Sequence, residues 1–353
     1  MNSKNLRVMK PGRQWMGVVA VASLPAIAAA QQPSGGGESS SGARARFVDE
    51  VIVEATRYST PKTATATKTD TALRDVPQSV SVITGDLIKD QNMLSMADVA
   101  RYVPGFTMGQ GEGHRDAPTL RGNSTTADFF VDGVRDDVQY FRDLYNAERI
   151  EVLKGPNAMI FGRGGGGGVV NRVTKRADGR HHGEVGLRGG SYDNKRIAAD
   201  FGDAVNEALA LRVNAMYEDS DSYRDFVDIE RYAVNPTLGV ALSDQTHLSF
   251  SYEHFNDERT VDRGVPARDG RPLAVGPSVF FGNPALSLSE ARVNLAAVTL
   301  EHDFSDTLRL RNQTQYADYD KFYQNVYPGS AVNAAGNVTL DAYQSGTDRH
   351  NLF

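Results

Sequence analysis

The chain from residue 181 onward alternates regularly between apolar and polar positions. In the clearest stretch one parity is apolar and the other is largely polar or charged: the first set is Leu209, Leu211, Val213, Ala215 and Tyr217, and the second is Ala210, Arg212, Asn214, Met216 and Glu218. Side chains two residues apart lie on the same face of a β-strand, so each strand has two unlike faces. Strands of about ten residues with this period are typical of antiparallel strands that span a bilayer.

The segments between these strands alternate in length. Short turns are predicted near 202–207, 243–246 and 305–306, and longer connections near 218–231, 256–291 and 321–345, after a shorter one at 189–194. Brief turns on one side and extended loops on the other indicate a membrane barrel. A soluble β-sandwich is the alternative, but its loops need not alternate in this way.

Residues 72–176 form a different unit, in which helical and strand patterns are mixed. Ser79–Ile83 alternates as a strand, and Ser95 with Asp98 predicts the start of a capped helix that ends near Pro104-Gly105. Strand-like pieces recur at 119–121, 128–134 and 150–154. These patterns predict a small α+β domain ahead of the long strands.

The N-terminal residues predict export. Residues 1–30 combine four basic residues, a short apolar run and the small-residue site Ala28-Ala29-Ala30, which together indicate a secretory signal peptide. Residues 31–48 are rich in Ser and Gly and predict a flexible linker. Residues 49–56 then form a short, isolated extended segment, which suits pairing with a strand edge on another protein; an ordinary edge strand is the alternative.

Composition excludes several classes of function. The chain has no cysteine, which rules out disulfides, thiol catalysis and cysteine metal sites. The net charge is -6, which gives no general attraction to nucleic acid. The histidines are scattered or adjacent without metal-ligand spacing, and no G-x-S-x-G nucleophile motif occurs. We therefore expect no enzyme activity, no metal site and no cofactor.

Within the glycine-rich segment, Gly162–Gly167 formally matches G-x-G-x-x-G. A phosphate-binding loop of that kind needs a following helix, whereas Val169–Thr174 is β-branched and alternating and predicts a strand. The run is therefore interpreted as a permissive connection between strands, with nucleotide binding as a distant alternative.

Four segments together form a distinctive pattern: Asp49–Thr56, the strand-like Val76–Thr84, Leu120-Arg121-Gly122 with Phe130–Asp136, and Glu148–Pro156 continuing through Phe161-Gly162-Arg163 to Lys175. They resemble the coupling box and the plug segments of one family, the TonB-dependent outer-membrane ferric siderophore receptors. The resemblance implies an α+β plug domain at 72–176, enclosed by a barrel of about 22 strands. Residues 181–353 would form the N-terminal part of that barrel. Only about eight strands can be counted, so we expect a fragment of such a barrel.

The resemblance also implies the function and the partners. The expected activity is import of a ferric siderophore, of the catecholate type by a slight preference, across the outer membrane of a Gram-negative bacterium, with contact to outer-membrane lipid. The coupling box would be Asp49, Glu50, Val51, Ile52 and Val53, which would pair with TonB and through it with the inner-membrane energising complex. Cobalamin, haem or an oligosaccharide remains an alternative cargo.

Ligand contacts are expected on the outward plug loops and the long barrel loops. Ferric siderophores are anionic or rich in oxygen, so arginines, amides and aromatic side chains are suitable contacts. The candidates are Arg115, Arg135, Gln139, Tyr140, Phe280 and Phe281. For each arginine, a structural ion pair is the alternative.

Overall fold

The computed structural model describes residues 58–60, 62–63, 68–69, 71–109, 111–155, 161–162 and 166–353. All of them belong to one compact unit, Ala43–Phe353. The predicted signal peptide, the linker and the box residues Asp49, Glu50, Val51, Ile52 and Val53 lie outside the described residues.

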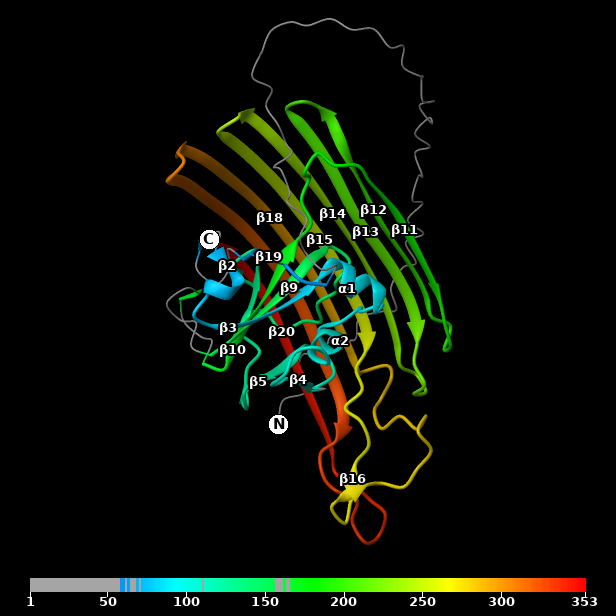
Figure 1. Ribbon diagram of the computed structural model, residues 1–353. Helices are drawn as coiled ribbons and strands as arrows, with labels where there is room; N and C mark the ends of the chain where they lie inside the picture. Colours follow the sequence, from blue (N-terminus) through cyan, green and yellow to red (C-terminus); the bar gives the residue numbers. More distant parts are fainter. Residues whose placement is uncertain are drawn as a thin grey trace, which may run out of the picture. The chain divides into compact units, whose positions relative to one another are not determined.

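The N-terminal part of this unit is the predicted α+β domain, which we call the plug (Figure 1). Its main sheet has the strand order β3-β9-β10-β7-β8, in which only β10 and β7 are parallel. The bounds are β3 Ser79–Thr84, β7 Phe129–Val131, β8 Val134–Arg135, β9 Ala147–Lys154 and β10 Gly168–Thr174. A second sheet contains β4 Phe106–Gly109, β5 Ala117–Leu120 and β6 Asn123–Ser124, and a short hairpin joins β1 Lys62–Thr63 to β2 Thr71–Ala72, followed by a 3-10 turn at Leu73–Asp75.

Two short helices pack on the plug sheet, α1 Gly85–Asp90 and α2 Met96–Ala100. The predicted capping box of α2 is confirmed, because the Ser95 hydroxyl accepts from the Asp98 N–H while the Asp98 carboxylate accepts from the Ser95 N–H. The helix ends earlier than predicted, at Ala100, and a turn leads to Gly105. Met96 and Val99 are fully buried against strand residues such as Ile150, which anchors the helix on the sheet.

The glycine run is followed by β10 and not by a helix, so the strand prediction is confirmed and the phosphate-loop geometry is absent from the described part. The reason for glycine lies in close backbone approach. A Cβ on Gly167 would lie 2.3 Å from the Leu120 carbonyl oxygen, and one on Gly168 would lie 2.3 Å from that of Leu153. Gly168 also has a φ of +147°. No larger residue fits there without moving a neighbouring strand.

Gly168→Ala is therefore expected to destabilise the plug by about 3 kcal/mol, because the added methyl overlaps the backbone of β9. Calorimetry of the purified receptor, with protease sensitivity of the plug as a second readout, measures this. Gly122→Ala is the matched control, since Gly122 has a φ of +82° and open space around its missing Cβ, and should cost only about 1 kcal/mol. Equal effects at the two positions would contradict the overlap.

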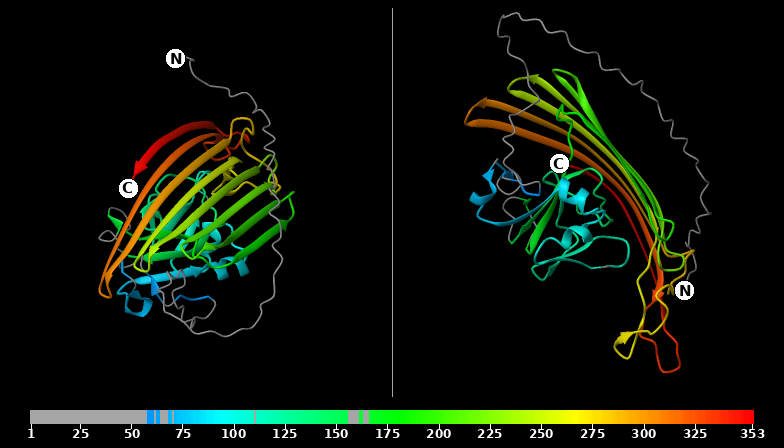
Figure 2. Two further views of the ribbon diagram at one scale, coloured as in Figure 1. Left: turned by 90° about the horizontal axis from the view of Figure 1, so that it is seen from above. Right: turned by 45° about the vertical axis from the view of Figure 1, so that its right-hand side comes forward.

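The rest of the chain forms one antiparallel sheet of eight strands, in the order β11-β12-β13-β14-β15-β18-β19-β20, as the alternation predicts. The bounds are β11 His182–Gly189, β12 Lys195–Asn206, β13 Leu209–Asp221, β14 Asp228–Ser243, β15 Thr246–Thr260, β18 Leu288–Ser305, β19 Leu308–Pro328 and β20 Leu340–Leu352. Figure 2 shows these strands as a single curved layer.

The short turns at 244–245 and 306–307 lie where predicted, whereas the turn predicted near 202–207 is confined to 207–208 because Gly202–Asn206 belong to β12. The long loops are shorter than expected, at 222–227, 261–287 and 329–339. The strands extend further because charged residues near the loops belong to them. Glu218 and Arg231, which mark the ends of one predicted loop, are directly paired partners in β13 and β14. The longest loop contains a small hairpin, β16 Ala267–Arg268 with β17 Arg271–Pro272.

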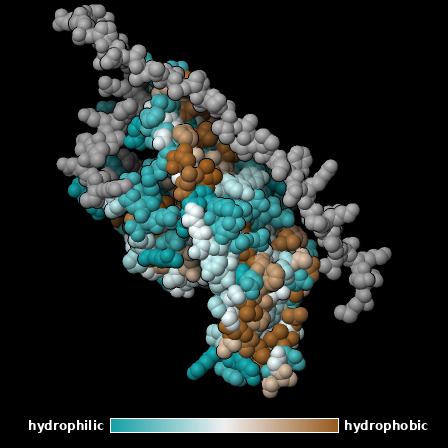
Figure 3. Space-filling model, turned by 90° about the vertical axis from the view of Figure 1, so that its right-hand side faces the viewer, coloured by the Kyte–Doolittle hydropathy of each residue, from teal (hydrophilic) through white to brown (hydrophobic). Residues whose placement is uncertain are grey.

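The two faces of the sheet differ as the alternation predicts. In β13, Leu211, Val213 and Tyr217 are exposed, while Arg212 and Glu218 on the other parity are buried. Hydrophobic side chains gather in exposed patches among hydrophilic ones on the side drawn in Figure 3. Within the described residues no helix is both long and apolar enough to cross a membrane.

Candidate functional site

The plug contacts the inward face of the sheet through buried ion pairs. Asp143 is fully buried in the segment between β8 and β9, and its carboxylate accepts from Arg196 of β12 at 2.8 and 2.9 Å. Arg231 of β14 lies 3.1 Å from the same carboxylate. Burial alone would raise the pKa of Asp143, but Arg231 and Arg196 hold it below its usual value. The carboxylate is therefore ionised and joins the plug to two strands.

A second polar contact lies beside it. Arg172 of β10 donates to both oxygens of Glu253 in β15, at 3.2 and 2.9 Å, and the Tyr145 hydroxyl donates to the same carboxylate at 3.2 Å. The Asn146 amide donates to Asn235 of β14 at 3.2 Å. These contacts are buried on both sides, so the plug is fixed to the sheet by charge pairs rather than by apolar packing alone.

Asp143→Asn is expected to weaken the docking of the plug by about 3 kcal/mol, because two buried guanidinium groups lose a shared negative charge. Differential scanning calorimetry measures the loss. The wild-type contact should also weaken in acid: its stabilisation is complete above the ordinary aspartate pKa and is lost as pH falls through the lowered value. Asp143→Asn should reduce that acid-dependent loss. An unchanged acid profile would contradict this role for Asp143.

Inside the plug, one arginine is surrounded by acceptors. Arg142 is buried and donates through Nε to Asp136 at 2.8 Å and through Nη2 to the carbonyl oxygens of Asp136 and Val138 at 2.6 and 2.9 Å. Its Nη1 lies 3.4 Å from Asp116. The guanidinium also lies over the rings of Phe129 and Tyr140, at 3.9 and 4.3 Å. This group holds the chain between β8 and β9 in place.

A third cluster, which we call the Glu112 cluster, joins the plug loop at 111–116 to the loop-side ends of the sheet. It consists of Glu112, His114, Arg115, Gln139, Arg263, Lys321 and Tyr323. The Glu112 carboxylate accepts from Arg115 at 2.7 Å and lies 3.0 Å from His114 Nε2. Arg115 also donates to the Gln139 amide oxygen at 3.1 Å.

The sheet supplies the other side of this cluster. The ammonium group of Lys321 in β19 contacts His114 Nδ1, and the His114 ring stacks on Tyr323 with 3.9 Å between centroids. Arg263, in the loop after β15, lies 3.9 Å from Glu112 and stacks on Tyr327 at 3.8 Å. Gly113 packs against the backbone of Asp262. The cluster therefore sits where β15 and β19 lead into the long loops.

The protonation state of the cluster follows from burial and charge. Burial, together with the Lys321 ammonium, lowers the pKa of His114 to about 4, so its ring is neutral. The Glu112 carboxylate can only accept, so the Nε2 of the neutral ring carries the proton and donates to it, and Nδ1 is the acceptor that faces Lys321. Burial would raise the pKa of Glu112, but hydrogen bonds from His114 and Arg115 hold it below its usual value.

Two of the predicted ligand residues, Arg115 and Gln139, meet in this cluster. Arg135 in β8 donates to the Ala127 carbonyl oxygen at 3.2 Å and lies over the Phe130 ring. Tyr140 is buried and donates to Asp136 at 2.9 Å. The structure thus gives Arg135 and Tyr140 contacts within the plug, and their roles as ligand contacts stay predictions.

Phe280 and Phe281 lie in the 261–287 loop, where Phe280 meets Phe226 edge to face with 6.3 Å between centroids. That loop is tied to the 222–227 loop, because Arg224 pairs with Asp262 at 2.7 Å and donates to the Val279 carbonyl oxygen. Val332 donates to the Ala267 carbonyl oxygen and adds the 329–339 loop. The lid role of the two phenylalanines stays a prediction.

Sequence reasoning missed Glu112, Lys321, Tyr323 and Arg263 as parts of this cluster. The loop pattern predicts Lys321 at the start of the 321–345 connection, although it shares the parity of Tyr319 and Tyr323 and therefore their inward face. That parity was a usable signal. No sequence signal indicates that Glu112 lies near Arg263, because the two residues are far apart in the chain and only the folded structure brings them together.

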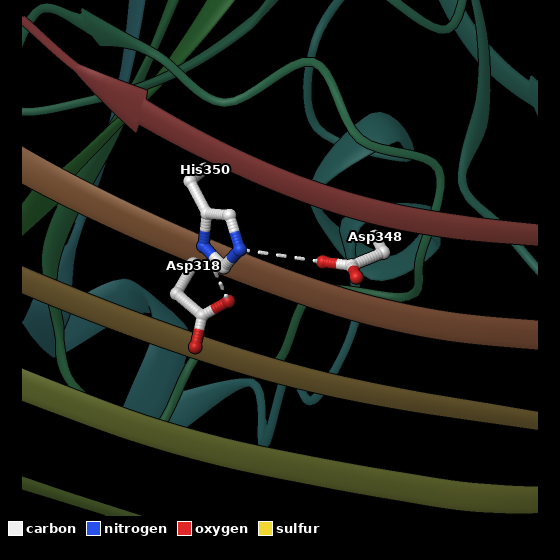
Figure 4. A group of neighbouring side chains, drawn as sticks. All are labelled: Asp318, Asp348 and His350. Carbon is white, nitrogen blue, oxygen red and sulfur yellow. Dashed lines mark ion pairs between the residues drawn. The ribbon is translucent and has the colours of Figure 1, made fainter.

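One group in the described residues has the composition of a metal site, Asp318 and Asp348 with His350 (Figure 4). The two ring nitrogens of His350 face different carboxylates, at 3.1 Å from Asp318 and 3.4 Å from Asp348. The arrangement is thus a histidine between two carboxylates on the outward parity of β19 and β20, and the imidazole cannot direct both nitrogens to one ion.

Known proteins share this architecture. Residues 72–169 match the TonB-dependent Receptor Plug Domain. The chain is 32% identical over 268 residues to the probable TonB-dependent receptor BfrD of Bordetella pertussis, covering 73% of this chain and 36% of that protein. It is 28% identical over 278 residues to the probable TonB-dependent siderophore receptor PiuA of Acinetobacter baumannii, covering 75% and 37%.

Among solved structures, the closed form of the ferric-catecholate import receptor Fiu from Escherichia coli K12 matches with a TM-score of 0.75 at 25% identity, covering 84% of this chain and 45% of that one. The chain spans less than half the length of each of these relatives. The matches include both the plug and the long strands. The chain therefore belongs to the TonB-dependent receptor family of the outer membrane, as a plug domain followed by part of a β-barrel.

Proposed function

We propose that this chain is part of a receptor that imports a ferric siderophore across the outer membrane, with TonB as the source of energy. The family is one of transporters and not of enzymes. Siderophore receptors are among the relatives, at 28% identity. The observation that carries the proposal is the Glu112 cluster, where Arg115, Arg263 and Lys321 converge at the loop-side end of the sheet.

The cluster is chemically suited to such a ligand. Guanidinium groups bind planar, oxygen-rich anions through paired hydrogen bonds, and Gln139 adds a neutral amide. The proposal assigns direct ligand contact to Arg115 and Gln139, with Phe280 and Phe281 closing over the ligand from the long loop. Arg135 and Tyr140 are kept as proposed ligand contacts that the plug holds in place, Arg135 through the Ala127 carbonyl oxygen and Tyr140 through the Asp136 carboxylate.

Energy must arrive through a partner because the outer membrane has no nucleotide supply. In this proposal the box at Asp49, Glu50, Val51, Ile52 and Val53 pairs with TonB by strand addition, and the inner-membrane energising complex then drives a partial opening of the plug. The buried pairs of Asp143 and Glu253 are the contacts that such an opening has to loosen.

The experiment is radioactive-iron uptake by cells carrying the complete reading frame, supplied with catecholate and hydroxamate siderophores in turn, with and without TonB. The proposal expects TonB-dependent uptake of one class. Arg115→Ala should reduce that uptake at limiting ligand concentration. Uptake of neither class would overturn the siderophore proposal and favour another nutrient.

A further inference from the structure

The Glu112 cluster contains one carboxylate for several cations. Arg115 touches Glu112 at 2.7 Å, Arg263 lies 3.9 Å away, and Lys321 reaches the same group through the neutral His114. Guanidinium groups stay protonated, so within this cluster the single Glu112 carboxylate faces two permanent positive charges, Arg115 and Arg263. The local excess of positive charge is a site for a further anion.

Hydrogen-bonding capacity is also left over. The Nε of Arg115 is buried and has no hydrogen-bond partner in the described structure. The Arg263 guanidinium stacks on the Tyr327 ring. Its contact with the Glu112 carboxylate is 3.9 Å long, which is too far for a hydrogen bond. A buried guanidinium nitrogen without an acceptor is costly, so an incoming oxygen would satisfy it.

We propose that the Glu112 carboxylate occupies the place of a ligand oxygen, and that an anionic siderophore binds by displacing it from Arg115. This inference rests on the proposed function and adds a specificity-determining residue to it. A strongly anionic ferric tris-catecholate complex can compete with one carboxylate for Arg115 and Arg263, whereas an uncharged ferric trihydroxamate cannot.

Displacement has a structural consequence for the plug loop. Glu112 is bonded to His114, and His114 is fixed to the sheet by Lys321 and by stacking on Tyr323. When the carboxylate leaves, the 111–116 loop loses one of its ties while His114 keeps its own. Binding of an anionic ligand thereby loosens the 111–116 loop of the plug.

The test is binding of a ferric tris-catecholate complex and of an uncharged ferric trihydroxamate to the receptor purified from outer membranes of cells carrying the complete reading frame. Glu112→Gln keeps the shape and removes the competing charge, so it should tighten binding of the tris-catecholate by about tenfold. Binding of the trihydroxamate should change less than about twofold. Glu112→Ala should tighten tris-catecholate binding in the same direction.

Glu290→Gln is the matched control. It removes the same charge from β18, where Glu290 is exposed on the parity opposite to the buried Ala291 and Val293, and should leave both affinities unchanged. Weaker or equal tris-catecholate binding by Glu112→Gln would overturn the inference, because Glu112 would then merely position Arg115. If wild-type receptor binds neither complex, the proposed function fails and the inference with it.

Discussion

Arg142→Ala is expected to destabilise the plug by about 5 kcal/mol, the largest effect of any single substitution considered. The guanidinium is 2% exposed and pairs with Asp136, which is fully buried, and with Asp116, which is 3% exposed. Its removal takes the paired cation from two buried carboxylates and a hydrogen-bond donor from three backbone carbonyl oxygens, those of Asp136, Val138 and Tyr140. It also deprives the Phe129 and Tyr140 rings of the cation stacked on them.

Calorimetry of the purified receptor measures this loss, with protease cleavage inside residues 111–146 as the local readout. Arg101→Ala is the control, because Arg101 is 76% exposed and its pair with Asp98 at 3.6 Å should contribute about 0.5 kcal/mol or less. If Arg142→Ala and Arg101→Ala unfold at the same temperature, the buried group does not hold the plug together.

The alternation of side chains was enough to predict the eight strands and their two faces. In β13 every second residue is buried, from Ala210 to Ser220, and Arg212 and Glu218 lie among them. The pattern succeeds because a strand in a membrane sheet faces a different medium on each side, and successive side chains point to opposite sides. The capping box at Ser95 was predictable for a similar reason, since its contacts lie within four residues.

The loop ends and the cation cluster were less predictable. Hydrophobicity cannot tell an inward-facing charge from a loop charge, so Glu218, Arg231 and Lys321 shortened the predicted strands, although all three lie within strands. The Glu112 cluster joins positions far apart along the chain, because Glu112 and His114 belong to the plug whereas Arg263 and Lys321 belong to the sheet and its loops. Their meeting depends on how the plug docks on the sheet, which no local pattern encodes.

Val53→Pro is expected to reduce iron uptake to the level of cells without TonB while ligand binding stays unchanged. The predicted box at Asp49–Val53 would act through its backbone, since strand addition uses main-chain N–H and C=O groups and tolerates many side chains. Proline removes one N–H donor and fixes φ, so it interrupts a paired strand. Ligand contacts would be untouched, because Arg115 and Gln139 lie on the plug loops.

Val53→Ile is the matched control, because it keeps the donor, the β-branched shape and the strand preference, and it should transport normally. Uptake and equilibrium binding are measured on the same cells. Arg115→Ala serves as the comparison, because it should weaken ligand binding, whereas Val53→Pro should leave it unchanged. Full transport by Val53→Pro would place the coupling segment elsewhere in the chain. Loss of binding together with transport would show that the substitution acts on the fold of the plug and not on its contact with TonB.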